Sequence, residues 1–206
     1  MRRWTSTLAI ALTITFARPA SPQSVPDLRK LYDAGKYQQV IELAGGAPAT
    51  DDQSRVTYLV ARSQEKLARK DEARGAYQQL AALSDQDPWS DIGRSALALR
   101  ASDAQGALDA ANQAVSHGES VPEAHFQRGF ALSARRDMAE AAAAFDRAAQ
   151  LDPAFAYAHY YAGIAYSKVK RIDLMAQHFD TFLKLAPQAP ERPEVQSIMR
   201  TLGGRD

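Results

Sequence analysis

The sequence predicts an all-α protein, an α-solenoid of stacked antiparallel helical hairpins. The same residue types return every 34 positions, as Ala73, Ala107 and Ala141 do. Between these returns, two apolar-periodic segments of about 12 residues flank a short polar break, the pattern of helix–turn–helix. A fixed period of this length is typical of stacked hairpins rather than of one globular core.

One unit, residues 122–155, shows why its positions recur. Its first helix is predicted at Glu123–Ala134 and its second at Met138–Leu151. Gly129 stands in the middle of the first helix, where glycine costs about 1 kcal/mol relative to alanine. We expect the second helix to cross closely at that point, with Phe145 filling the space beside the crossing.

The ends of the second helices also follow the period. Asp137 precedes one of them in a capping-box spacing, and Asp103 has the same role one period earlier. Pro153 and Pro187, again one period apart, fall where a second helix must stop.

These residues resemble the tetratricopeptide repeat (TPR), whose helical hairpins form a right-handed superhelix. The match is nearly complete in residues 122–155, at His125, Gly129, Leu132, Ala141, Phe145, Ala148 and Pro153. The resemblance places repeats at about 21–53, 54–87, 88–121, 122–155 and 156–189. A capping helix is expected at 194–202, so residues 27–202 are predicted to form one domain.

The first residues are typical of a secretory signal peptide. A basic start is followed by an apolar run, Thr5–Phe16, and then by small residues. The run is 12 residues long, short of the roughly 20 that cross a bilayer as a helix. We predict a cleavable signal at 1–17, a cut between 17 and 24, and a linker at 18–26. The chain is then periplasmic or secreted, or is anchored by an uncleaved segment.

Composition excludes several classes of function. The 25 basic and 24 acidic side chains give a charge of +1, and losing Arg2 and Arg3 makes it −1. Nucleic-acid binding depends on phosphate neutralisation, so a near-neutral chain without a basic stripe argues against it. The absence of cysteine excludes disulfides and thiol catalysis.

No motif for catalysis, cofactor or metal is convincing, so a non-enzyme without cofactor or metal is predicted. Ser63 and Lys66 form a Ser-x-x-Lys pair without companion motifs, which leaves a hydrolase as a distant alternative. His125 and His159 share one repeat position, a bulky packing site in the family. His117 and His178 have no companion at metal-ligand spacing.

The resemblance implies a peptide-binding groove on the concave face, which the first helices line. Carried over position by position, it becomes apolar and aromatic in the later repeats. The predicted groove residues are Trp89, Ile92, Phe126, Phe130, Tyr157, Tyr160 and Ile164. Exposed apolar patches of this kind mark binding sites, and aromatic side chains are common interface anchors. The alternative is that a tight superhelix buries some of them as core.

The family's clamp for a terminal carboxylate needs Lys and Asn at two positions of each first helix. This chain has Tyr58/Arg62, Ile92/Ala96, Phe126/Phe130 and Tyr160/Ile164 there. The predicted function is therefore an adaptor or scaffold of the cell envelope that holds a partner's apolar segment in the groove. A self-associating structural scaffold is the alternative.

Overall fold

The computed structural model describes residues 24–45 and 53–203, and every regular element in them is a helix. The predicted signal peptide lies outside these residues. The elements are α1 (Val25–Asp33), α2 (Tyr37–Ala44), α3 (Gln53–Lys66), α4 (Lys70–Ala81), α5 (Pro88–Arg100), α6 (Ala104–His117), α7 (Pro122–Ala134), α8 (Met138–Leu151), α9 (Ala156–Lys168), α10 (Ile172–Leu185) and α11 (Arg192–Gly203). None of these helices is long and apolar enough to cross a membrane.

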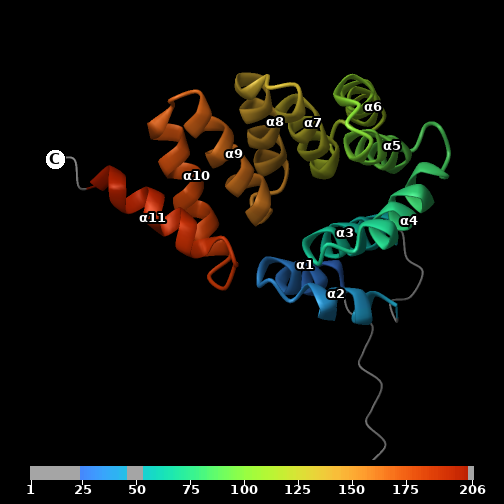
Figure 1. Ribbon diagram of the computed structural model, residues 1–206, viewed down its shortest axis with the longest axis horizontal. Helices are drawn as coiled ribbons and strands as arrows, with labels where there is room; N and C mark the ends of the chain where they lie inside the picture. Colours follow the sequence, from blue (N-terminus) through green and yellow to red (C-terminus); the bar gives the residue numbers. More distant parts are fainter. Residues whose placement is uncertain (1–23, 46–52, 204–206) are drawn as a thin grey trace, which may run out of the picture.

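The helices pair in chain order as antiparallel hairpins, and each hairpin packs on the next. Figure 1 shows the result, an arch that runs from α1 and α2 over α5 to α8 and down to α10 and α11. The predicted all-α solenoid is confirmed, and α11 covers the expected capping segment. The helix α1 begins at Val25, inside the segment predicted as a linker, and the Ser24 side chain accepts from the Asp27 amide at its start.

The crossing inside each hairpin is as close as the small residues suggest. A Cβ atom added at Gly129 would come within 2.5 Å of the Phe145 ring, and one at Gly163 within 2.5 Å of the Phe179 ring. Both rings are buried. Glycine is therefore required in these two helices because the aromatic side chain of the paired helix lies against its backbone.

The hairpin turns share one backbone conformation. Ala68, Ser102, Arg136 and Lys170, which hold the same position in successive repeats, all have φ between 58° and 70°. This left-handed residue ends the first helix, as in a Schellman motif. The turn at Ser102 illustrates it, because the Asp103 amide donates to the Ala98 carbonyl over 2.9 Å.

The predicted capping residues behave differently from one another. Asp103 accepts a hydrogen bond from the Gly106 amide over 2.8 Å, as expected. The prediction for Asp137 is wrong, because its side chain makes no capping hydrogen bond. Asp137 instead lies 3.1 Å from the guanidinium of Arg135 in the turn before it.

The arch closes on itself. A Cβ added at Gly35 would come within 2.7 Å of Pro190, so the turn of the first hairpin touches the connection between α10 and α11. Lys66 at the end of α3 donates to Glu191 in the same connection. The inner helices of the first two hairpins therefore face those of the last two across the concave side.

Candidate protein-binding face

The seven predicted groove residues all lie on the inner helices, but most are covered. Four are buried: Ile92, Phe126, Tyr157 and Tyr160. The other three keep partial exposure: Trp89, Phe130 and Ile164. Of the two possibilities that the sequence leaves open, groove or core, these four residues are in the core and the other three stay partly exposed. The predicted role in binding stays a prediction.

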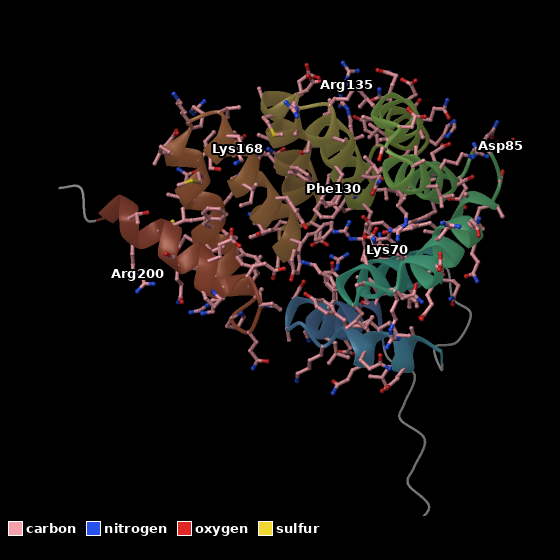
Figure 2. The ribbon with its side chains drawn as sticks, viewed as in Figure 1. Lys70, Asp85, Phe130, Arg135, Lys168 and Arg200 are labelled. Atoms are coloured by element: carbon pink, nitrogen blue, oxygen red, sulfur yellow. The ribbon has the colours of Figure 1, made fainter. Side chains whose placement is uncertain are left out.

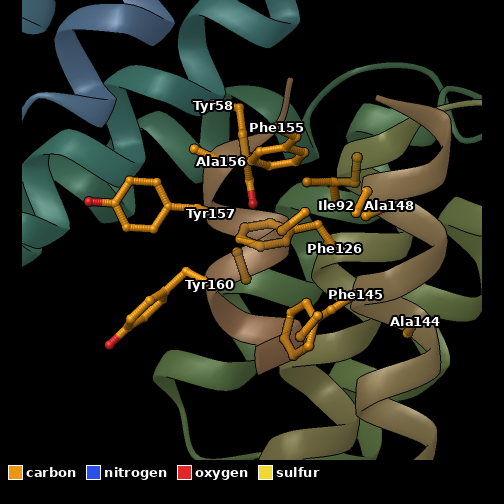
Figure 3. Close-up of a cluster of buried hydrophobic side chains, with 14 of the residues drawn as sticks. Tyr58, Ile92, Phe126, Ala144, Phe145, Ala148, Phe155, Ala156, Tyr157 and Tyr160 are labelled. Carbon is orange, nitrogen blue, oxygen red and sulfur yellow. The ribbon is translucent and has the colours of Figure 1, made fainter. Parts of the chain in front are cut away.

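The residues of α7 and α9 form one aromatic cluster with their neighbours (Figure 3). The ring centroids of Phe126 and Phe130 are 4.7 Å apart, and Phe130 lies 4.7 Å from Tyr161. Tyr160 continues the cluster at 5.0 Å from Tyr161. Most of these pairs meet edge to face, the arrangement that aromatic quadrupoles favour. Figure 2 shows Phe130 on the inside of the arch, toward α3.

Trp89 lies apart from this cluster. Its ring packs 5.9 Å from that of Tyr58 on α3, and the guanidinium of Arg55 lies 5.7 Å from the ring centroid. Trp89 therefore packs on α3, as Phe126 and Phe130 do through the guanidinium of Arg62 on the same helix.

Cationic side chains of the first two hairpins cover the aromatic cluster. The Arg62 guanidinium lies 4.6 Å from the Phe130 centroid and 5.6 Å from that of Phe126. Arg29 lies 4.7 Å from the Phe155 centroid, and Lys66 lies 5.0 Å from that of Tyr157. Each distance falls within the range of cation–π attraction. Cationic side chains of the chain itself therefore contact the aromatic face that the sequence analysis assigns to a partner.

A buried carboxylate joins the two sides of the concave face. Glu123, 1% exposed, accepts from the Arg29 guanidinium over 2.8 Å and from Arg55 Nε over 2.9 Å. Arg29 also donates to Asp152 after α8. A charge can be buried only when it is paired, so Glu123 depends on two arginines that come from other hairpins.

A second polar link lies at the closing edge of the arch. The Tyr157 hydroxyl donates to Glu191 over 2.7 Å and lies 3.3 Å from the Tyr37 hydroxyl. Burial by itself raises the pKa of Glu191, but hydrogen bonds from Lys66 and Tyr157 lower it below its usual range. Burial also raises the pKa of Tyr157, which keeps its proton available for this bond.

Sequence reasoning missed the residues that cover the groove, namely Arg29, Tyr32, Lys66 and Glu191. The sequence held no clear signal for this cover. The repeat position of Arg62 is occupied by Ala96, Phe130 and Ile164 in the later units, which is no regular pairing of cation and aromatic residue.

Ser63 and Lys66, the residues of the hydrolase alternative, are each bonded to other groups. Ser63 is fully buried, and its hydroxyl donates to the Leu59 carbonyl one turn earlier over 2.8 Å. Lys66 is bound to Glu191. A nucleophilic serine must be reachable by substrate and by its base, and Ser63 meets neither condition.

Two histidines do have companions. His178 Nδ1 lies 3.1 Å from His159 Nδ1, and His178 Nε2 lies 3.4 Å from an Asp146 oxygen. His117 Nδ1 lies 2.8 Å from Asp91. The sequence shows no ligand-spaced companion for His178, and α9 and α10 bring it beside His159, 19 positions away along the chain. Among the described residues, no group of three or more candidate ligands is placed to hold a metal ion.

Comparison with known proteins agrees with the hairpin geometry. Residues 122–155 match the family model of the tetratricopeptide repeat. This is the unit whose sequence pattern is the most complete. No curated protein matches the chain.

Solved structures with the same fold are similar over most of the chain. A thermophilic TPR protein of Thermus thermophilus has a TM-score of 0.59 at 20% identity, with 86% of this chain and 95% of that chain covered. YrrB, described as a TPR protein with an unusual peptide-binding site, has a TM-score of 0.51 at 18% identity, with 84% and 90% covered. The first TPR domain of Spaghetti (RPAP3), bound to an HSP90 peptide, has a TM-score of 0.54 at 16% identity, with 59% and 99% covered.

Proposed function

We propose that this chain is a non-catalytic adaptor that binds a segment of a partner protein on its concave face. The observation that carries the proposal is the aromatic cluster of α7 and α9. Beside its buried rings, Phe130 and Ile164 pack on the core and stay partly exposed. Rigid aromatic side chains that already have their neighbours in place lose little entropy on binding, which makes them efficient anchors. The peptide sites of YrrB and of the Spaghetti domain support this use of the fold.

A crosslinking pull-down from the native envelope tests the proposal. The bait is the full chain beside a Phe130→Ser/Ile164→Ser variant, with Ile172→Ser as the control because Ile172 is 44% exposed at the start of α10. Circular dichroism first establishes that each variant keeps its helices. A prey lost only with the double variant supports the concave face. The same preys with all three baits would place binding elsewhere and sink the proposal.

We also propose that the chain is exported to the periplasm or secreted, on the basis of its amino-terminal sequence. The pattern of a basic start, an apolar run and small residues is that of a signal peptide. Intact-mass measurement of the native protein tests this. A mass that begins after Ala17 supports export with cleavage, and a mass that includes Met1 contradicts the cleavage.

A further inference from the structure

A cavity of about 610 Å³ opens at one rim of the arch, where the start of α7 and the ends of α8 and α10 approach α1. Its walls combine apolar residues, such as Pro122 and Leu185, with several charged side chains. A smaller cavity of about 190 Å³ adjoins it and shares Leu185. Pockets of this size that offer both apolar walls and polar groups are usual binding sites for side chains and small molecules.

One carboxylate lines both cavities and has no partner. Asp33, the last residue of α1, is only 9% exposed. In the described part of the chain its side chain has neither a hydrogen bond nor an ion pair. Burial of an unpaired carboxylate is costly, so nearly all buried acids in proteins have a donor or a cation beside them. Asp33 is thus a mostly buried carboxylate that has no hydrogen-bond donor or cation bound to it.

Arg29 and Arg55 are each bound to other carboxylates, and Arg29 Nε is buried without a hydrogen-bond partner. Arg29 divides its two terminal nitrogens between Glu123 and Asp152, and Arg55 donates to Glu123. Arg29 and Arg55 are thus bound to Glu123 and Asp152, and among the described residues no cation is hydrogen-bonded to Asp33. The remaining cation of the wall, Lys30, is 80% exposed and faces Asp27, 3.8 Å away on the same helix.

We propose that this rim cavity binds a lysine or arginine side chain of a partner protein, with the cationic head on Asp33 and the alkyl stem along Leu185 and the neighbouring prolines. The proposal rests on the function proposed above, because it takes the ligand to be a segment of a bound protein. A long cationic side chain fits both features of the site, since its stem is apolar and its head supplies the missing charge and donors.

The protonation of Asp33 follows from the same environment. Burial raises the pKa of Asp33 to about 7; the positive charge of Arg29 opposes this rise, and the negative charges of Asp152 and Glu191 add to it. A bound cation favours the ionised form, so binding must release a proton from the fraction of molecules in which Asp33 is protonated. The affinity for the cation should therefore increase from about pH 6 to about pH 8.

Titration calorimetry with a defined peptide tests the inference. The probe is acetyl-Ala-Leu-Lys-Leu-Ala-amide, compared with the same peptide carrying Nε-acetyl-lysine, which keeps the stem and removes the charge. We expect the full chain to bind the charged peptide with a Kd of about 0.1 mM, and the acetylated peptide about tenfold more weakly. Repeating the titration at neutral pH in buffers of different ionisation enthalpy should show proton release.

Asp33→Asn is the test variant and Asp27→Asn the control, because Asp27 lies on the same helix but is 50% exposed outside the cavity. The test variant should lose both the preference for the charged peptide and the proton release, and the control should keep both. Equal affinity of the wild type for the two peptides would overturn the inference, as would an unchanged preference in the Asp33 variant. Self-association that requires Asp33, without peptide binding, would overturn it in favour of a second copy.

The outcome is separate from that of the adaptor proposal. If the Asp33 variant captures the same preys as the wild type while the Phe130/Ile164 variant loses them, the adaptor stands and the cation site falls. If peptide binding requires Asp33 but no prey depends on Phe130 and Ile164, the cation site stands and the concave aromatic face is not where the partner binds.

Discussion

At the scale of single residues, packing around a glycine outweighs helix propensity. Gly129→Ala adds a better helix former, worth about 1 kcal/mol, but its Cβ would lie 2.5 Å from the buried Phe145 ring. We expect a net loss of about 1–3 kcal/mol in the free energy of unfolding, since an overpacked core must shift. Gly75→Ala in α4 is the control, because nothing lies within 4 Å of its added Cβ.

Urea unfolding of both variants measures the effect. Gly75→Ala should gain up to about 1 kcal/mol, because only propensity changes there. If both substitutions stabilise the protein by the same amount, the crossing of α7 and α8 is looser than described.

The pair of His159 and His178 predicts a loss of stability in acid. Burial lowers the pKa of both below the ordinary value of 6.5; the Asp146 charge raises the pKa of each, and the neighbouring ring lowers that of His178. The unfolded chain therefore binds protons first. The stability that the neutral pair contributes is complete above 6.5 and is lost as the pH falls through the lowered native values.

The double substitution His159→Gln/His178→Gln should flatten this acid-side decline of the free energy of unfolding. His125→Gln is the comparison, since the repeat of His125 has Ala144 at the position that His178 holds in the next repeat. The single variant should remove less of the decline than the pair does. Parallel unfolding curves of all three proteins against pH would contradict the prediction.

At the scale of elements, the hairpin turns carry strain that glycine would relieve. Ala68 has φ of 58°, a conformation that costs an L-residue about 1–2 kcal/mol. Ala68→Gly should therefore raise the free energy of unfolding by about 0.5–1 kcal/mol, after the entropy cost of glycine is deducted. Ala110→Gly in the middle of α6 is the control and should lower it by about 1 kcal/mol. Thermal unfolding of both variants decides whether the left-handed turn is the cause.

How much of the fold the sequence predicts depends on whether a feature repeats. Gly129 and Phe145 identify the hairpin crossing because the contact is local and returns at the same position of the next repeat. The sequence does not predict the left-handed turns, since these positions hold residues such as Ala68 and Arg136 instead of glycine, the usual signal of a positive φ. It predicts the caps only in part, because the side chain of Asp137 prefers the guanidinium of Arg135 to a backbone amide.

At the scale of the whole molecule, the curvature of the solenoid determines how far the residues of the predicted groove are buried. Each hairpin rotates slightly against the next, and only the sum over successive hairpins brings Arg62 over Phe126 and Phe130. No single repeat position records that sum. The sequence therefore predicts which residues lie on the inner face and leaves open whether Phe126 and Tyr157 are buried there.

Closure of the arch gives this solenoid a contact that an open array lacks. In open repeat arrays stability is a sum of each repeat and its nearest-neighbour interfaces. Here Lys66 and Glu191, 125 residues apart, are joined by a hydrogen bond, and both are mostly buried. We expect a double-mutant cycle on Lys66→Ala and Glu191→Ala to give a coupling energy of about 1–2 kcal/mol in urea unfolding.

The matched pair is Lys184 and Asp180, which are 73% and 56% exposed on α10. As an exposed pair within one helix, it should couple by less than about 0.5 kcal/mol. A coupling of Lys66 with Glu191 as small as that of the control would mean that the ends of the arch separate in solution. The aromatic cluster would then face water as the open groove that the sequence predicts, because the cations of α1 and α3 would no longer cover it.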